Sequence, residues 1–183
     1  YGINNARYVQ IEAQNWNALW ESNFEPVNVD GRVLIRAPFH QSDPNVDFEI
    51  VIMPKMSFGT GHHATTKMMV EMILDSTLVG LRGLDMGSGT GVLAIVAAKL
   101  GAESVVAVEI DDMAEESVRE NIELNNVADK IVSVCGDASA IEGKEFDIVL
   151  ANINRNILLA DMEAYVATMP LGGKLIVSGF LKE

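Results

Sequence analysis

Apolar and polar blocks alternate along the chain from Leu81 onward, and their lengths predict a regular succession of strands and helices. Short apolar runs predict strands at residues 82–87, 104–110, 130–136, 146–153 and 174–180. Longer segments predict helices at residues 92–100, at residues 112–125, and from Asn154 to a break at Pro170. Because the strand segments are almost continuously apolar, they indicate an α/β fold with a parallel sheet covered by helices on both faces.

The N-terminal part has a different pattern. Residues 1–24 predict a polar lead-in and a helix with large apolar residues on one face, namely Trp16, Leu19, Trp20 and Phe24. Alternating runs on either side of Asp30-Gly31 predict a β-hairpin, and residues 48–54 predict a third strand. We therefore expect a lead-in helix and small β section over residues 1–57, followed by the main domain over residues 58–183.

Local patterns add three narrower predictions. The many apolar positions at residues 65–75 predict a helix that is buried on more than one side. Asp112 with Glu115 three residues later predicts a capping box at the start of the helix at residues 112–125. Cys135 lies in the apolar run IVSVC, and we expect it to be a buried small side chain rather than a nucleophile.

The segment at residues 83–100 organises the domain, because a strand ending near Asp85 is followed by glycines at alternate positions. Gly87, Gly89 and Gly91 would allow positive backbone dihedral angles and close approach of a ligand. The first N–H groups of the following helix would point toward that ligand. An ordinary strand-to-helix turn is the alternative interpretation.

Polar or small residues also follow the neighbouring strands, where ligands of parallel sheets bind. These positions are Glu109-Ile110-Asp111, Gly136-Asp137-Ala138 and Ala151-Asn152-Ile153. A dinucleotide motif has the spacing G-x-G-x-x-G, whereas the third glycine here comes one position early. The pattern therefore favours a nucleoside ligand without a pyrophosphate.

Two carboxylates refine the choice of ligand. Glu109 closes a strand, where it can accept hydrogen bonds from both hydroxyls of a ribose. Asp85 is unfavourable beside a pyrophosphate but favourable beside a cation. S-adenosylmethionine combines a ribose, an adenine and a positive centre. We expect Asp85, the glycine turn and the Asp137-Ala138 edge to serve its sulfonium, amino group and adenine.

Composition narrows the partners and the location. The 26 acidic and 13 basic residues give a net charge of −13, which disfavours nonspecific nucleic-acid binding and would attract a basic protein. No apolar run is long enough to span a bilayer, and the first residues lack a signal-peptide pattern, so a cytoplasmic location is expected. A single cysteine and three histidines make a metal site unexpected.

The segment LDMGSGTGVLAI resembles the first motif of class I methyltransferases, which have a Rossmann-like sheet. FGTGHHATT upstream, with VEID, NNV and ANINRNIL downstream, resembles the ribosomal-protein lysine methyltransferases of the PrmA type. The resemblance implies S-adenosylmethionine-dependent methylation of amino groups on a basic large-subunit ribosomal protein. It implies cofactor contacts at Thr66, Gly87, Glu109 and Asn152, and a mobile loop from Phe58 and Gly59 to His63.

The chain also departs from that family. Ala64 stands where the family usually has proline. The segment ANIN lacks the Pro-Pro-aromatic motif of enzymes that methylate exocyclic amines, so no platform for stacking a flipped base is expected. The family's N-terminal recognition domain and its last antiparallel strands are absent, so we expect a chain truncated at both ends. Its exposed sheet edge could associate with another copy, and the oligomeric state stays open.

Methyl transfer to lysine needs a neutral amine, whose proton must leave before attack. Asn152 is expected to orient that amine, and His63 is a candidate proton acceptor, although it could instead contact cofactor or solvent. Two alternatives remain open. One is a methyltransferase of the same fold with another protein or a small molecule as acceptor, and the other is a noncatalytic nucleotide-binding module.

Overall fold

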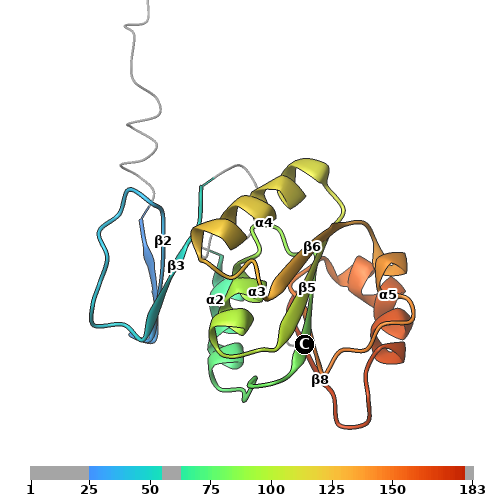
Figure 1. Ribbon diagram of the computed structural model, residues 1–183. Coiled ribbons are helices and arrows are strands. Elements are labelled where there is room, and N and C mark those ends of the chain that lie inside the picture. The colour runs from blue at the N-terminus through green and yellow to red at the C-terminus, as the bar shows by residue number, and fades with distance from the viewer. Residues whose placement is uncertain (1–24, 55–62, 180–183) are drawn as a thin grey trace, which may run out of the picture.

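The computed structural model describes residues 25–54 and 63–179. The predicted helix with Trp16 and Trp20 lies outside these residues, as does the junction at residue 57. Figure 1 shows two sheets, with helices on both sides of the larger one. Among the described helices, none has the length and apolar character needed to cross a membrane.

The larger sheet has five parallel strands in the order β6-β5-β4-β7-β8. Their bounds are β4 (Arg82–Met86), β5 (Ser104–Glu109), β6 (Ile131–Cys135), β7 (Ile148–Ala151) and β8 (Lys174–Val177). The prediction of five strands in a parallel sheet is confirmed. The chain runs outward from β4 to β6 and then returns to add β7 on the other side of β4. That reversal leaves a crevice beyond the carboxyl ends of the central strands.

Side chains alternate along each strand between two apolar clusters, one on each face of the sheet. Val105, Ala107, Ile148 and Leu150 face a cluster that includes α2 (Ala64–Leu74), α3 (Val92–Lys99) and α4 (Asp112–Leu124). Val108, Val149 and Ala151 face the other cluster, with the 3-10 helix η1 (Ala138–Ile141) and α5 (Arg155–Ala167). The period of two therefore explains why these strands are apolar on both faces.

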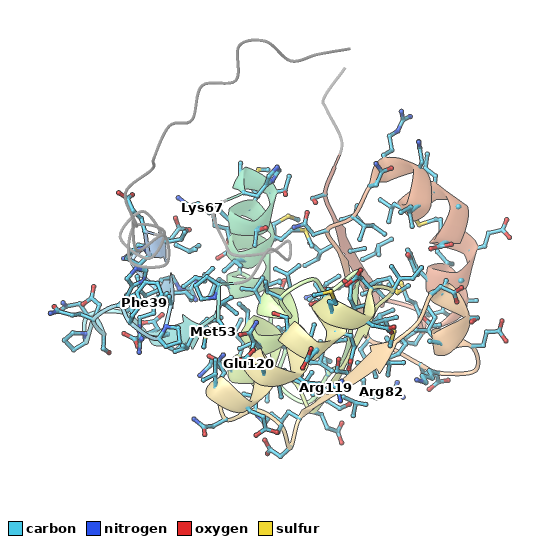
Figure 2. All side chains as sticks on the ribbon, turned by 90° about the horizontal axis from the view of Figure 1, so that it is seen from above. Phe39, Met53, Lys67, Arg82, Arg119 and Glu120 are labelled. Atoms are coloured by element: carbon cyan, nitrogen blue, oxygen red, sulfur yellow. The ribbon has the colours of Figure 1, made fainter. Side chains whose placement is uncertain are left out.

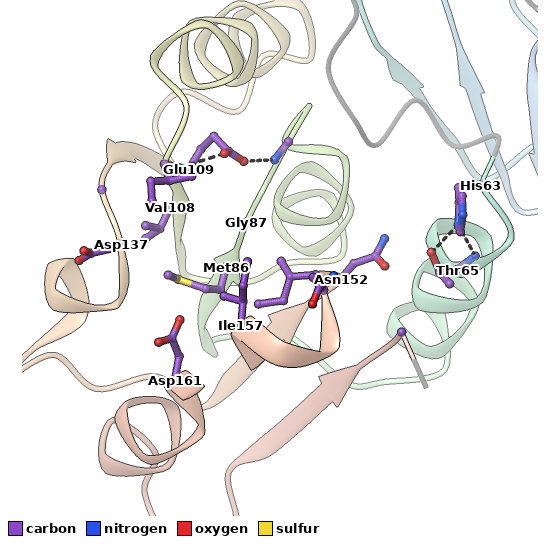
Figure 3. A pocket seen from close by; sticks show the side chains of 16 residues that line it. His63, Thr65, Met86, Gly87, Val108, Glu109, Asp137, Asn152, Ile157 and Asp161 are labelled. Atoms are coloured by element: carbon purple, nitrogen blue, oxygen red, sulfur yellow. Dashed lines mark hydrogen bonds between the residues drawn. The ribbon is translucent and has the colours of Figure 1, made fainter. Parts of the chain in front are cut away.

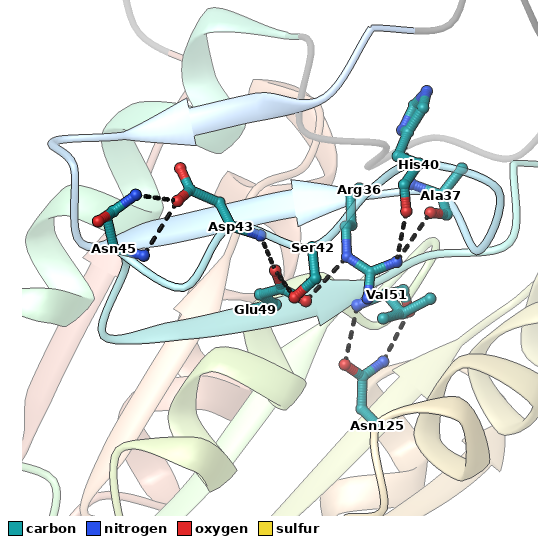
Figure 4. A network of polar contacts seen from close by, with 9 residues as sticks. All are labelled: Arg36, Ala37, His40, Ser42, Asp43, Asn45, Glu49, Val51 and Asn125. Carbon is teal, nitrogen blue, oxygen red and sulfur yellow. Dashed lines mark hydrogen bonds and ion pairs between the residues drawn. The ribbon is translucent and has the colours of Figure 1, made fainter.

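The smaller sheet confirms the predicted hairpin and third strand. Its strands are β1 (Val27–Val29), β2 (Val33–Arg36) and β3 (Phe48–Val51). Asp30 and Gly31 have φ angles of 52° and 68°, and they are the central residues of a turn that the Arg32 N–H closes by donating to the Val29 carbonyl at 2.9 Å. The third strand, β3, pairs parallel to β2. Figure 4 shows how Arg36 and Glu49 tie these two strands together through an ion pair of 2.8 Å.

Two asparagines, one in α4 and one at its C-cap, dock the smaller sheet onto the main domain. Asn125 accepts a hydrogen bond from the Val51 N–H (2.9 Å) and donates one to the Val51 carbonyl (2.7 Å), as Figure 4 shows. Asn121 accepts a hydrogen bond from the Met53 N–H at 2.8 Å. Val29, Val33, Ile35, Ile50 and Ile52 belong to the same apolar cluster as α2 and α3. The smaller sheet therefore shares its core with one face of the larger one.

Ion pairs between side chains connect the amino ends of the central strands. Arg82, labelled in Figure 2, contacts Asp147 and Glu145 at 3.2 Å each. The Arg82 guanidinium holds the pKa of the Asp147 carboxyl below its usual range. These contacts join β4 and β7 at the edge opposite the glycine turn.

Three local predictions were wrong. Asp111, rather than Asp112, is the N-cap of α4, and its carboxylate accepts a hydrogen bond from the Ala114 N–H at 2.9 Å. Helix α2 is buried on one face only, because Met68 and Met72 are half exposed. Cys135 is exposed because β6 is an edge strand, and a contact with Asp112 raises the pKa of its thiol to about 11. The predicted cap at Asn154 is confirmed.

Candidate functional site

A cavity of about 580 Å³ lies beyond the carboxyl ends of the central strands (Figure 3). Its walls come from the ends of the five parallel strands, from the start of α2 and from the first two turns of α5. Residues from both halves of the sheet line it, including Gly87, Gly89, Glu109, Asp137, Asn152 and Asp161. This volume is within the range of small-molecule and cofactor sites.

The glycine turn forms the floor of the cavity. Gly87, Gly89 and Gly91 have φ angles of 67°, 58° and 78°, which side chains with a Cβ rarely adopt. A Cβ on Gly87 would collide with Cγ2 of Ile153. The Gly87 and Ser88 N–H groups both donate to the Val108 carbonyl, at 2.9 and 3.0 Å. The turn is therefore closed tightly against the end of β5.

Asp85 lies behind the glycine turn instead of lining the cavity. The residue is 1% exposed, and its carboxylate accepts a hydrogen bond from the Ala94 N–H (3.0 Å), in the first turn of α3. Burial raises the pKa of Asp85 to about 7, and the nearby negative charge of Glu109 adds to the rise. In this structure Asp85 supports the turn from beneath, and direct contact with a ligand stays a prediction.

Glu109 connects the end of β5 to the glycine turn and lines the cavity. Its Oε2 accepts a hydrogen bond from the Gly89 N–H at 2.8 Å. Its Oε1 accepts from the N–H groups of Ile110 and Asp111 at 2.9 and 3.2 Å. Backbone donors therefore hold the carboxylate in one orientation at the cavity wall, as Figure 3 shows. Such a carboxylate can accept two further hydrogen bonds from a diol.

Asp137 follows the edge strand β6 and caps η1. Its Oδ1 accepts hydrogen bonds from the Ser139 N–H (2.9 Å) and the Ser139 hydroxyl (2.7 Å), which hold its pKa below the usual range. Asp137 lines the cavity. Ala138 does not, since it packs against the apolar cluster beneath η1.

Asn152 follows β7 and lines the opposite part of the cavity. Its Nδ2 donates to Oγ1 of Thr66 at 3.2 Å, and its Oδ1 accepts a hydrogen bond from the Ser178 hydroxyl. Thr66 is fully buried in α2, so it reaches the cavity through Asn152 rather than directly. The side-chain amide is therefore fixed between α2 and the end of β8.

His63 is the N-cap of α2 and lines the same part of the cavity. Its Nδ1 lies 2.7 Å from Oγ1 of Thr65 and 3.3 Å from the Thr65 N–H, which donates to it. Phe58 and Gly59, which were also predicted at the site, lie outside the described residues.

The structure thus brings seven of the predicted residues to the cavity wall: His63, Gly87, Gly89, Glu109, Ile110, Asp137 and Asn152. It places Thr66, Asp85, Gly91 and Ala138 behind that wall. Sequence reasoning missed, among others, Thr65, Val108, Ile157 and Asp161, which line the cavity, and Ser178, which contacts Asn152. Ser178 follows β8 directly, but the predicted strand at residues 174–180 extends past it. Ile157 and Asp161 lie inside a helix, where nothing in the sequence distinguishes lining residues from ordinary surface residues.

The charge of the described cavity lining disfavours one ligand class. Its described lining includes the carboxylates of Glu109, Asp137 and Asp161, and it includes no lysine or arginine. A pyrophosphate would lie beside these carboxylates without a compensating cation, whereas a sulfonium or an amino group would be attracted.

A five-stranded parallel sheet with helices on both faces, a glycine turn after β4 and an acid at the end of β5 together define a Rossmann-like nucleotide-binding domain. Residues 2–183 match the family model described as ribosomal protein L11 methyltransferase (PrmA). The chain belongs to this family, and the resemblance inferred from FGTGHHATT and ANINRNIL is confirmed.

Individual relatives agree with the family model. The chain is 52% identical over 171 residues to the ribosomal protein L11 methyltransferase of Porphyromonas gingivalis, covering 92% of this chain and 59% of the relative. It is 49% identical to that of Bacteroides fragilis, covering 94% and 62%. A crystal structure of the ribosomal protein L11 methylase from Lactobacillus delbrueckii subsp. bulgaricus has a TM-score of 0.78, at 30% identity, covering 85% and 80%. The chain therefore spans about 60% of the length of these two curated relatives.

Proposed function

We propose that this chain binds S-adenosylmethionine in the cavity and is the catalytic domain of a protein methyltransferase whose substrate is ribosomal protein L11. The observation that carries the cofactor is Glu109, a carboxylate fixed by three backbone N–H groups at the wall of a cavity whose described lining has no cationic side chain. Membership of the ribosomal protein L11 methyltransferase family supports the substrate.

The positions of the lining residues support one orientation of the cofactor. Glu109 would accept the two ribose hydroxyls, since its oxygens already have fixed directions. Asp137, beyond it at the end of β6, would accept from the adenine amino group. The methionine part would then extend over Gly87 toward Asn152. This orientation follows the strand order β6-β5-β4-β7 from one end of the cavity to the other.

The cofactor supplies an activated methyl group, and the protein aligns the acceptor amine and keeps it neutral. Asn152 would orient that amine, because contacts with Thr66 and Ser178 hold its amide in place. His63 stands at the same part of the cavity and is the candidate that would take up the proton. A closed cavity around these groups would disfavour the charged form of the amine.

The charge of the chain supports a basic protein as partner. A net charge of −13 attracts cationic surfaces and disfavours nucleic acid. An amino group of a ribosomal protein is therefore a better acceptor than a base of RNA, and a cytoplasmic location fits such a substrate.

Calorimetric titration tests the cofactor. We expect S-adenosylmethionine and S-adenosylhomocysteine to bind and NAD not to bind. Binding of NAD alone would overturn the proposal. Transfer of a labelled methyl group to L11 in a mixture of purified ribosomal proteins, with the full-length protein as enzyme, tests the substrate. Labelling of another protein in place of L11 would keep the cofactor and reject the acceptor.

A further inference from the structure

Asp161 is a carboxylate at the cofactor cavity that the proposed function has not used. It lies in the second turn of α5 and lines the cavity together with Asn154 and Ile157. These residues are spaced three and four apart, so they share one face of the helix. The face of α5 that meets the cavity therefore ends in a negative charge.

A buried tyrosine positions this carboxylate. Tyr165 is 0% exposed, and its hydroxyl donates to Oδ2 of Asp161 at 3.3 Å. Burial and the neighbouring carboxylate raise the pKa of the tyrosine, so the hydroxyl keeps its proton and stays a donor. Among the described residues no donor contacts Oδ1, the second oxygen of Asp161. One oxygen is thus occupied by the helix, and the other is available to a ligand.

The position of Asp161 selects the part of the ligand that it would meet. Helix α5 packs against η1, whose cap is Asp137. Figure 3 shows Asp137 and Asp161 at one end of the cavity, whereas Asn152 and His63 lie toward the other. In the proposed orientation this is the adenine end, beyond the ribose carboxylate Glu109.

We propose that Asp161 is a second base-selecting residue, which accepts one hydrogen of the adenine 6-amino group while Asp137 accepts the other. This inference rests on the proposed function. An amino group with two hydrogens matches two carboxylate acceptors, whereas the 6-oxo group of hypoxanthine is itself an acceptor and would face both carboxylates without donating to either. The pair would therefore select adenine over a 6-oxo purine.

The competing explanation is that Asp161 serves only to satisfy the buried Tyr165 hydroxyl. Asp161→Asn separates the two roles, because an amide oxygen still accepts from Tyr165. Its remaining NH₂ group would then face the base as a donor. That donor would repel a 6-amino group and match a 6-oxo group.

The experiment measures the affinities of S-adenosylhomocysteine and S-inosylhomocysteine by calorimetry for the unaltered chain and for Asp161→Asn. Glu163→Gln, an exposed acid of the same helix, is the matched control. We expect the unaltered chain to prefer the adenosyl ligand by roughly 100-fold, and Asp161→Asn to reduce that preference by about tenfold or more. The control should keep the full preference.

The outcomes separate the inference from the proposed function. If the unaltered chain binds S-adenosylhomocysteine and Asp161→Asn leaves the preference unchanged, the inference fails and the proposed function stands. If the unaltered chain binds neither ligand, both fail. If thermal melting shows that Asp161→Asn does not fold, the test rests on the unaltered chain. A preference of less than roughly tenfold for S-adenosylhomocysteine over S-inosylhomocysteine would then overturn the inference. Tyr165→Phe should reduce the preference less than Asp161→Asn, because it frees the carboxylate without removing it.

Discussion

Three carboxylates at the ends of adjacent strands show how the surroundings of a residue decide its role. Asp85 is buried and has a raised pKa, Glu109 is fixed by backbone N–H groups at the cavity wall, and Asp137 caps η1 and has a lowered pKa. All three precede helices, so the local sequence pattern does not distinguish their roles. Only Glu109 and Asp137 face the ligand cavity, whereas Asp85 holds the glycine turn from behind.

Replacement of Glu109 tests the ribose contact. Glu109→Ala should weaken binding of S-adenosylhomocysteine by roughly 10- to 100-fold, because it removes a charged acceptor of two hydrogen bonds. The exposed acid Glu116 lies on the next helix, so Glu116→Ala is the control and should bind normally. Calorimetry measures both affinities. An unchanged affinity in Glu109→Ala would remove the ribose assignment.

Asp85 should make stability depend on pH. Its pKa in the folded state, about 7, lies above the ordinary value of 3.8, so the folded protein binds its proton more tightly than the unfolded chain. The resulting stabilisation is present below pH 3.8 and is lost as the pH rises to about 7, at up to about 1.4 kcal/mol per pH unit. Asp85→Asn should remove this part of the slope in urea unfolding between pH 5 and 7. The same slope in Asp85→Asn as in the unaltered chain would contradict the prediction, and Asp129→Asn, at an exposed acid, is the control.

At the scale of the elements, the molecule combines one rigid glycine turn with units that dock against it. The glycine turn joins β4 to α3 and is closed against β5, so its backbone N–H groups have fixed directions. The smaller sheet is attached to α4, the helix that follows the Glu109 strand end. If that attachment loosened, it would disturb the apolar cluster that the smaller sheet shares with α3, the helix that follows the glycine turn.

Asn125→Ala should destabilise the attachment of the smaller sheet. It removes hydrogen bonds to both backbone groups of Val51 and to the Asn121 carbonyl, and unsatisfied buried groups cost about 1–3 kcal/mol each. Amide hydrogen exchange should become faster at β3, while β7 on the far side of the sheet should keep its protection. Glu123→Ala, on an exposed position of the same helix, is the control. Equal protection of β3 in both variants would show that the apolar core alone holds the sheet.

Element boundaries were predictable to within a few residues, and the misses have local physical causes. Asp111 and Asp112 are adjacent residues of the same type, so only the backbone conformation decides which one caps α4. The run IVSVC reads as a buried strand, yet β6 is at the edge of the sheet, and Cys135 is exposed there. Strand order decides exposure, and strand order is a property of the whole sheet.

The whole molecule combines a locally negative cavity with an acidic overall charge. If its partner is a basic ribosomal protein, long-range attraction should contribute to their association, and salt should weaken it. Binding of the proposed cofactor should be less sensitive to salt. The dependence of affinity on ionic strength can therefore distinguish binding of the ribosomal protein from binding of the cofactor.

We expect the KM for L11, measured with the full-length protein, to rise roughly tenfold between 50 and 300 mM NaCl, because the Debye length shortens from about 14 to about 6 Å. The dissociation constant of S-adenosylhomocysteine should change less than about twofold over the same range, since this ligand is a zwitterion without net charge. Methyl-transfer kinetics and calorimetry measure the two quantities. A salt-independent KM would indicate that the acidic charge serves solubility alone.

Local sequence determined the strands and helices, the glycine turn and the acid after β5, because each depends on residue types within a few positions of one another. FGTGHHATT and ANINRNIL were also sufficient to indicate the family. The tertiary structure decided which residues of that set meet. It placed Asp85, Thr66 and Gly91 behind the cavity wall, and it brought Ser178 and Asp161 to the site from segments that the sequence does not mark. The physical reason is that contact between distant segments depends on strand order and helix packing. The glycine turn is thus readable from the chain, whereas the wall that faces it is assembled only by the fold.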